Sequence, residues 1–244
     1  MKAVRVAAVS YLNTKPLLWG LEQAHNKLPM ELQLDYPAAL ASMLGAGEID
    51  LALLPVAAIS SIPGARIVSR YGIAADGEVA SVAVFSQVPL EQIERVYLDY
   101  QSRTSVRLTR LLFEQYWNKE VEFLDAPEDY ISKIQDSTAG VIIGDRALQA
   151  LPAFEYVYDL ATAWQTWTGL PFVFAAWVAT KELPGDFMKE FDLAQSVGLS
   201  QIDAVVKANP FAAYSLHKYY TENIQYEMTE ERRKGLEEFL RKIA

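Results

Sequence analysis

The sequence contains no cysteine and only two histidines in 244 residues. Without cysteine the chain can form no disulfide, no thiolate metal site and no cysteine nucleophile. The histidines, His25 and His217, are far apart in the sequence and lack the spacing of metal ligands. A structural zinc site or a histidine-centred catalytic triad is therefore not expected.

Long hydrophobic runs are also missing. No apolar run approaches the roughly 20 residues that a membrane-spanning helix needs. The first apolar run, residues 3–9, is interrupted by Arg5 and is not followed by a small-residue cleavage site. We therefore expect no signal peptide, no membrane association and a cytoplasmic location.

The chain has fewer basic than acidic residues: 22 Lys and Arg against 31 Asp and Glu, which gives a net charge of −9. This balance argues against binding to nucleic acid or to an anionic membrane. An anionic substrate would have to be held by local donors against the field of the whole chain. Moderate salt should then lower KM by screening the long-range repulsion.

Strand and helix signals alternate in two cycles, the first at residues 4–54 and the second from about residue 90 to 151. This order predicts two α/β lobes, each a mostly parallel sheet flanked by helices. We assign residues 1–86 plus 178–244 to lobe one and residues 87–177 to lobe two. Two chain crossings near Phe85 and Phe174 then form a hinge, and the ligand cleft is expected between the lobes.

The loops after the strands hold the candidate site residues, because ligands of open α/β sheets lie beyond the carboxyl ends of the strands. The first loop offers the polar groups of Ser10, Tyr11, Asn13 and Thr14. The alternative reading is that Asn13 or Thr14 only caps the following helix. Lys15, the one cation of this loop, is more simply explained as a solvated side chain.

A second candidate is the helix start at residues 102–105. Ser102 can cap this helix, while the free N–H groups and hydroxyls of Thr104 and Ser105 can form a cradle for an anion. The helix dipole would attract a carboxylate without any net positive charge on the chain. Arg103 either helps to bind the anion or is solvated, and an ordinary capped helix start remains the alternative.

Three further positions complete the set of candidates. Gly144 and Asp145 follow a strand, and Asp145 either caps a helix or faces the cleft. Gly169 lies in a tight turn, where a glycine would allow a ligand to approach the backbone closely. Ser81, next to the first predicted crossing, either bonds to local backbone or directs its hydroxyl into the cleft.

The segment at residues 9–17, VSYLNTKPL, resembles the chorismate dehydratase family of the futalosine route to menaquinone. The resemblance covers nearly the whole chain. It extends, in the same order, to residues 51–56 (LALLPV), 102–106 (SRTSV), 143–148 (IGDRAL) and 168–175 (TGLPFVFA).

The resemblance implies a two-lobed fold like that of type II periplasmic binding proteins. It also implies dehydration of chorismate, a small dicarboxylate, to 3-[(1-carboxyvinyl)oxy]benzoate, without a metal or an organic cofactor. Under this reading Thr104 and Ser105 hold one carboxylate, and Asn13 binds developing charge or the leaving hydroxyl. Ser81 and the backbone near Gly169 hold the other end of the substrate. The proton acceptor stays unassigned, and the sequence does not reveal an oligomeric state.

Two other functions remain open from the sequence. One is a small-anion binding or sensing protein of the same fold without catalytic activity, since fold alone does not separate it from an enzyme. The other is the related enzyme that forms 1,4-dihydroxy-6-naphthoate. That enzyme begins with a different loop and uses a histidine, and neither His25 nor His217 lies in a matching place.

Overall fold

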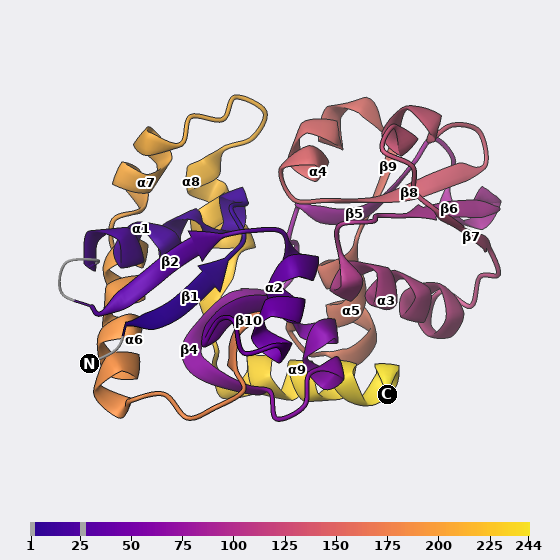
Figure 1. The fold of residues 1–244 in the computed structure, drawn as a ribbon. Coiled ribbons are helices and arrows are strands. Elements are labelled where there is room, and N and C mark those ends of the chain that lie inside the picture. Colours follow the sequence, from indigo (N-terminus) through magenta and orange to yellow (C-terminus); the bar gives the residue numbers. More distant parts are fainter. Residues whose placement is uncertain (1–2, 25–27) are drawn as a thin grey trace.

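Two sheets form the two lobes of the protein, which lie side by side in Figure 1. The computed structural model describes residues 3–24 and 28–244, so His25 lies outside the described residues. The strands of lobe one are β1 (Val4–Ala8), β2 (Met30–Leu34), β3 (Leu51–Pro55), β4 (Arg66–Ala75), β10 (Phe172–Ala179) and β11 (Gln225–Glu227). The strands of lobe two are β5 (Val82–Ser86), β6 (Arg95–Leu98), β7 (Glu122–Asp125), β8 (Thr138–Ile143) and β9 (Tyr156–Asp159). The sheets have the orders β11-β4-β10-β3-β1-β2 and β7-β6-β8-β5-β9.

Helices flank both sheets. Lobe one carries α1 (Lys15–Ala24), α2 (Pro37–Gly45), α6 (Gly185–Leu199), α7 (Ile202–Ala208), α8 (Leu216–Lys218) and α9 (Glu230–Ile243), and lobe two carries α3 (Arg103–Leu111), α4 (Asp145–Ala150) and α5 (Leu160–Thr168). Short 3₁₀ turns are η1 (Leu12–Thr14), η2 (Val56–Ser61), η3 (Leu90–Gln92), η5 (Tyr130–Lys133) and η6 (Leu151–Ala153), and two π-helical turns are η4 (Leu112–Tyr116) and η7 (Tyr219–Asn223). The C-terminal helix α9 contacts both β10 and α3, and so touches both lobes (Figure 1).

The predicted two-lobed α/β fold is confirmed, but both sheets are mixed rather than mostly parallel. β1 is parallel to β2 and β3, and β6 is parallel to β7 and β8. β10 is antiparallel to β3 and β4, and β5 is antiparallel to β8 and β9. The reason is that β5 and β10 each enter their sheet from the other lobe. They start at the edge where the parallel strands end, and so run against them.

Both chain crossings lie earlier than the sequence predicted. Residues 76–81 connect β4 to β5, and residues 169–171 connect α5 to β10. Phe85 lies within β5 of lobe two and Phe174 within β10 of lobe one, so neither marks a crossing. The predicted boundaries therefore assign residues 82–86 and 172–177 to the wrong sheets. A hydrophobic run indicates a buried strand but does not indicate which sheet contains it.

Aromatic residues that precede and begin β10 belong to the core. Trp164 and Phe172 are fully buried, and the ring of Phe239 from α9 packs 4.9 Å from that of Phe172, centroid to centroid. The indole N–H of Trp164 donates to the carbonyl of Pro171 over 3.2 Å. These contacts fix α9 and the second crossing against each other. Within residues 3–24 and 28–244, no helix is both long enough and apolar enough to cross a membrane.

Candidate functional site

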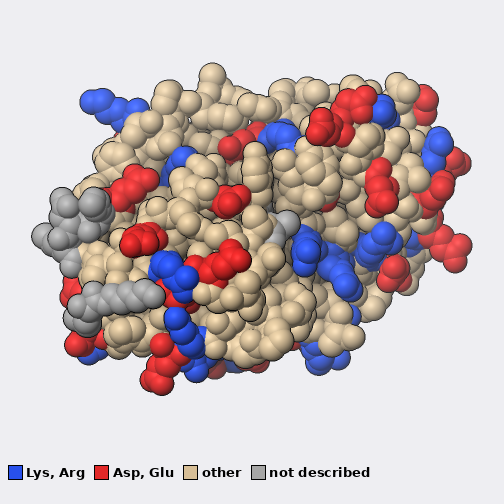
Figure 2. Space-filling model, viewed as in Figure 1, with Lys and Arg blue, Asp and Glu red and all other residues tan. Residues whose placement is uncertain are grey.

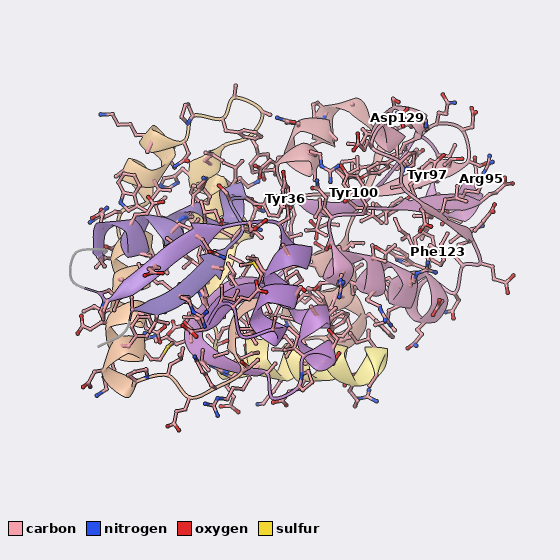
Figure 3. The ribbon with its side chains drawn as sticks, viewed as in Figure 1. Tyr36, Arg95, Tyr97, Tyr100, Phe123 and Asp129 are labelled. Carbon is pink, nitrogen blue, oxygen red and sulfur yellow. The ribbon has the colours of Figure 1, made fainter. Side chains whose placement is uncertain are left out.

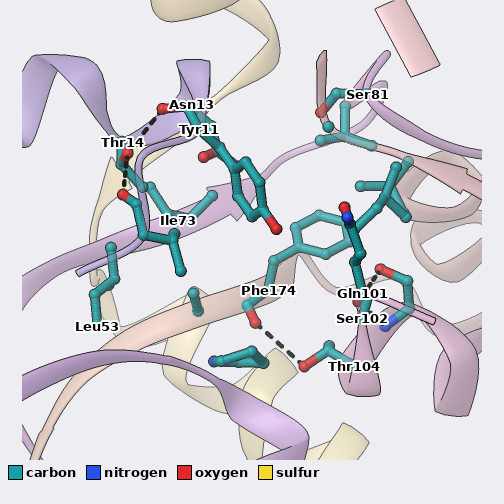
Figure 4. A pocket seen from close by; sticks show the side chains of 18 residues that line it. Tyr11, Asn13, Thr14, Leu53, Ile73, Ser81, Gln101, Ser102, Thr104 and Phe174 are labelled. Carbon is teal, nitrogen blue, oxygen red and sulfur yellow. Dashed lines mark hydrogen bonds between the residues drawn. The ribbon is translucent and has the colours of Figure 1, made fainter. Parts of the chain in front are cut away.

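A pocket lies between the lobes, at the end of the sheets where both crossings occur. About 660 Å³ of space free of protein atoms lies within it, and part of this space is continuous with the solvent. Its described lining consists of Val9, Tyr11, Asn13, Thr14, Leu53, Pro55, Ile73, Val79, Ser81, Val82, Gln101, Ser102, Thr104, Ser105, Ile143, Gly144, Phe174 and Ala175. In Figure 4, Tyr11 and Asn13 lie on one side of the pocket, and Gln101 and Ser102 lie on the other.

The first loop is folded by its own side chains into a tight turn. The hydroxyl of Thr14 lies 2.8 Å from the carbonyl oxygen of Val9 and 2.7 Å from that of Tyr11, and can donate to either (Figure 4). This bonding leaves Thr14 without a helix-capping role, since its hydroxyl meets carbonyl groups and not N–H groups. The turn brings the side chains of Tyr11 and Asn13 to the pocket.

Two buried oxygen atoms of this loop have no hydrogen-bond partner among the described residues: Tyr11 Oη and Asn13 Oδ1. Asn13 therefore does not cap the helix through this oxygen. Burial and the nearby charge of Asp99 raise the pKa of Tyr11, so its hydroxyl keeps its proton. Buried polar atoms are nearly always hydrogen-bonded, and an exception at a pocket wall indicates a place where a ligand supplies the partner.

Ser81 lies at the first crossing and is held from several directions. Its carbonyl accepts from the N–H of Gly144 over 2.7 Å, and Gly144 has a φ of +64°, which favours glycine. The residues before it, Val79 and Ala80, donate their N–H groups to the Asp159 carboxylate. The side chain of Ser81 is buried at the pocket wall. Its hydroxyl makes no hydrogen bond to local backbone, which argues against the first of the two sequence alternatives. That the hydroxyl is directed into the cleft stays a prediction.

The start of α3 closes the pocket from the side of lobe two. Ser102 caps the helix, because its hydroxyl accepts from the N–H of Ser105 over 3.0 Å. The same hydroxyl donates to Ser105 Oγ over 2.9 Å, which leaves the hydroxyl proton of Ser105 available to a ligand. The N–H groups of the first two helix positions precede the intrahelical hydrogen bonds and also remain available.

The predicted anion cradle is wrong in one member, Thr104, although this residue lines the pocket. Its hydroxyl accepts from the N–H of Ala57 over 3.2 Å and donates to the carbonyl of Phe174 over 3.3 Å. Both partners belong to lobe one, so this hydroxyl joins the lobes and is not free to bind an anion. The cradle is therefore reduced to Ser105 and the backbone of the helix start.

We expect Thr104→Val to lower the free energy of unfolding by about 2 kcal/mol, because it leaves two buried backbone groups unpaired across the lobes. For a chain of this size that corresponds to a fall in Tm of about 4–8 °C. The matched control is Thr109→Val in the same helix, whose hydroxyl donates only to the Ser105 carbonyl one turn earlier. Equal losses of Tm in the two variants would contradict the interlobe role of Thr104.

Asp145 lines a smaller hollow next to the pocket and shares Tyr11, Gln101 and Gly144 with it. Its carboxylate accepts from the N–H of Leu12 over 3.1 Å, which is a second bond between the lobes. Burial raises the pKa of Asp145, whereas the Leu12 hydrogen bond and the charge of Lys15 oppose the rise. Asp145 is thus a buried carboxylate at the edge of the pocket.

Besides Asp145, three of the predicted site residues do not line the pocket: Ser10, Arg103 and Gly169. The exposed Ser10 hydroxyl accepts from the Lys15 ammonium over 3.0 Å, and neither residue of this pair lines the pocket. Arg103 lines a hollow on the outer side of α3. Gly169 ends α5 in the left-handed conformation, with φ +74°. It does not line the pocket, because this turn precedes Phe174 and Ala175, the residues of β10 that reach the pocket.

The sequence reasoning did not select a group of lobe-two residues beside the pocket. The guanidinium of Arg146 donates to the buried carboxylate of Asp99 over 2.6 Å and to the Gln101 side chain over 3.0 Å. The ion pair of Arg146 and Asp99 thus orients the side chain of Gln101, which lines the pocket. Figure 3 shows Tyr36 of lobe one and Tyr100 of lobe two on the facing edges of the lobes, and both are exposed. The only available signal was that residues 99–101 follow a strand.

The arrangement suits the binding of a small polar molecule by hydrogen bonds. Among the described residues that line the pocket, none carries a carboxylate, an imidazole or an amine. Across residues 3–24 and 28–244, no three His, Asp or Glu side chains are grouped so that they could hold a metal ion. His217 is exposed and lies 3.7 Å from the Asp203 carboxylate, away from the pocket lining. Chemistry at this site therefore depends on hydroxyl, amide and backbone groups.

Comparison with known protein families finds a match to a family described as "Menaquinone biosynthesis", over residues 4–244. The chain is also similar to a protein named chorismate dehydratase from Thermus thermophilus. The two are 27% identical over 266 residues, covering 92% of this chain and 94% of that protein.

Comparison with solved structures finds the same fold in proteins of low sequence identity. Protein AF1704 from Archaeoglobus fulgidus has a TM-score of 0.78 at 16% identity and covers 98% of this chain and 96% of its own. The alkanesulfonate-binding protein SsuA from Xanthomonas axonopodis, solved with MOPS bound, has a TM-score of 0.67 at 10% identity, covering 98% and 91%. At these identities the likeness concerns the fold alone, which is that of periplasmic binding proteins.

Proposed function

The chain belongs to the menaquinone biosynthesis family, and from this premise we propose that it is an enzyme that dehydrates chorismate. The observation that carries the proposal is the pocket between the lobes. Its wall holds two buried oxygen atoms, on Tyr11 and Asn13, without partners in the described part of the chain. The similarity to a chorismate dehydratase over 92% of the chain supports the choice of substrate.

The reaction removes one water molecule from the substrate ring. The ring proton beside the enolpyruvyl ether is removed, the adjacent C–O bond breaks, and the hydroxyl leaves as water. The ring becomes aromatic, so the reaction is downhill overall. The product is 3-[(1-carboxyvinyl)oxy]benzoate, which we propose is passed to the futalosine route to menaquinone.

The residues of the pocket have three roles in this proposal. Asn13 binds the hydroxyl that leaves, where negative charge develops, and acts by a preorganised hydrogen bond. Ser81 donates from the first crossing to a second oxygen of the substrate. Ser105 and the N–H groups of the α3 start hold a carboxylate, because the start of a helix attracts anions.

The proton acceptor follows from the chemistry of the lining. The described lining residues include no carboxylate, imidazole or amine, and the carboxylate of Asp145 lines the adjoining hollow instead. That carboxylate already accepts from Leu12 between the lobes. We therefore assign the proton to the substrate's own enolpyruvyl carboxylate, and the protein contributes by holding it against the ring.

Incubation of the purified protein with chorismate tests the proposal. We expect chorismate to be replaced by the aromatic enol ether, followed by ultraviolet absorbance and chromatography against a sample without protein. Chorismate that survives at high protein concentration would overturn the enzymatic proposal. Binding of chorismate without conversion would instead indicate a binding or sensing protein of the same fold.

The distribution of charge alters the salt dependence expected from the sequence. Arg103 and Arg107 line the outer hollow on α3, which shares Ser102 with the pocket. Figure 2 shows basic side chains gathered over this part of lobe two. Along this hollow three arginines, Arg103, Arg107 and Arg110, outnumber two carboxylates, Asp99 and Asp125, and charges beyond about 10 Å are largely screened at 0.1 M salt. Salt should therefore raise KM, not lower it.

We expect Arg103→Gln together with Arg107→Gln to raise KM for chorismate about fivefold at low salt, because the local attraction of the anionic substrate is lost. The difference should shrink as the salt concentration rises. The control with the same change in net charge is Lys189→Gln with Lys207→Gln, on α6 and α7 of lobe one. A similar KM in both double variants at low salt would show that only the net charge matters.

A further inference from the structure

Tyr219 of the π-helical turn η7 contacts Ser81 but does not itself line the pocket. Its phenolic hydroxyl donates to Ser81 Oγ over 2.7 Å, although the two residues are 138 positions apart. Tyr219 is fully buried, and Ser81 is 1% exposed and lines the pocket. The hydrogen bond therefore connects the C-terminal segment to the wall of the site.

The direction of this hydrogen bond determines where the Ser81 proton can point. A serine hydroxyl has one proton and two lone pairs. Because Tyr219 donates to one lone pair, the Ser81 proton must be directed elsewhere. Ser81 Oγ is the only hydrogen-bond partner of the fully buried Tyr219 Oη among the described residues, so the Tyr219 proton has no other acceptor. Burial also raises the pKa of Tyr219, which keeps the phenol protonated. The Ser81 hydroxyl then has the cavity before it and can donate to a ligand there.

The surrounding structure holds both residues in place. On the side of Ser81, the Asp159 carboxylate fixes the two preceding residues through their N–H groups. On the side of Tyr219, the amide of Asn223 donates to the Glu78 carbonyl over 3.1 Å, which ties the turn η7 to the same crossing. Single π-helical turns are rare and often occur at functional sites.

We propose that Tyr219 is a positioning residue for the reaction. By donating to Ser81 it fixes the Ser81 hydroxyl as a donor into the cavity, where that hydroxyl meets a substrate oxygen on which charge develops. A chain of hydrogen bonds polarises its members, so the Ser81 donor is strengthened as well as oriented. The identity of the substrate in this inference rests on the proposed function.

The test compares Tyr219→Phe with Tyr226→Phe, both of which delete only a buried hydroxyl. Tyr226 Oη has no partner among the described residues, so its loss should leave activity within about twofold. We expect Tyr219→Phe to lower kcat for chorismate about tenfold while KM changes less than about twofold. Equal kcat values in the two variants would overturn the proposal.

A double-mutant cycle with Ser81→Ala separates positioning from a general structural effect. Once the Ser81 hydroxyl is removed, Tyr219 has nothing to orient, so Tyr219→Phe should cause no further loss of kcat in the Ser81→Ala protein. A further loss as large as in the wild-type background would show that Tyr219 acts independently of Ser81, and would also overturn the proposal.

The wild-type assay distinguishes this inference from the proposed function. If wild-type protein does not convert chorismate, the proposed function fails. Crystal structures without substrate then test whether Tyr219 positions the Ser81 hydroxyl. In the wild type we expect Ser81 Oγ within hydrogen-bond distance of both Tyr219 Oη and a cavity water. In Tyr219→Phe we expect a rotated Ser81 side chain or loss of that water. An unchanged Ser81 and water would refute the positioning role.

Discussion

Replacing Asn13 with alanine is expected to lower kcat for chorismate about 100-fold, the usual effect of deleting one preorganised donor to developing charge. The amide lines the pocket, and its Nδ2, which makes no hydrogen bond to a described residue, is the donor to the leaving hydroxyl. The buried Oδ1 has no partner among the described residues and can accept the proton of that hydroxyl. An amide that binds the leaving hydroxyl mainly in the transition state should affect turnover far more than the binding of product. We therefore expect the Kd of the product to change less than about tenfold.

The stability of the same variant provides the control. A buried oxygen without a partner reduces stability, so the Tm of the Asn13→Ala protein should equal or exceed that of the wild type. A fall in Tm together with a fall in kcat would indicate that Asn13 mainly holds the loop together. Equal losses in kcat and in product affinity would show that the amide only binds.

Much of the fold could be predicted because local sequence patterns reflect local structure. The alternating strand and helix signals predicted over residues 4–54 correspond to β1, α1, β2, α2 and β3. Strand direction after a chain crossing was not predictable, because the pattern of β10 is the same whether it runs parallel or antiparallel to its neighbours. The short strand β11 was missed, since three residues within a polar tail carry too little periodicity.

The candidate site shows the same division between local and distant information. The rule that ligands lie at strand ends selected Tyr11, Asn13 and Gly144, which do line the pocket. It also selected Gly169, because the turn before β10 was assumed to end at the site. Tyr219 could not be found in this way, because it contacts Ser81 only through the tertiary fold and lies 138 positions away in the sequence.

The second large effect is expected from Gly198→Ala, at the contact between α1 and α6. A Cβ at Gly198 would overlap the carbonyl oxygen of Pro16, and a Cβ at Gly20 would overlap that of Ala194. These are backbone atoms of helices and cannot move aside alone, so the two helices must separate. We expect a loss of at least about 3 kcal/mol, a large part of the stability of a typical domain. Urea unfolding should show it as a lower midpoint.

The consequence for the site follows from the chain order, because α1 begins directly after the loop that carries Asn13. Separation of α1 from α6 should therefore displace that loop and reduce kcat even at temperatures where the variant stays folded.

The matched control is Gly45→Ala at the end of α2, where a Cβ would meet no described atom within 4 Å. That change should leave kcat unaltered and should leave stability equal or slightly higher, since alanine favours the helix over glycine. A Gly198→Ala protein as stable as Gly45→Ala would mean that α1 and α6 do not pack closely. The position of Asn13 would then have to be fixed by the hydrogen bonds of Thr14 within the loop itself.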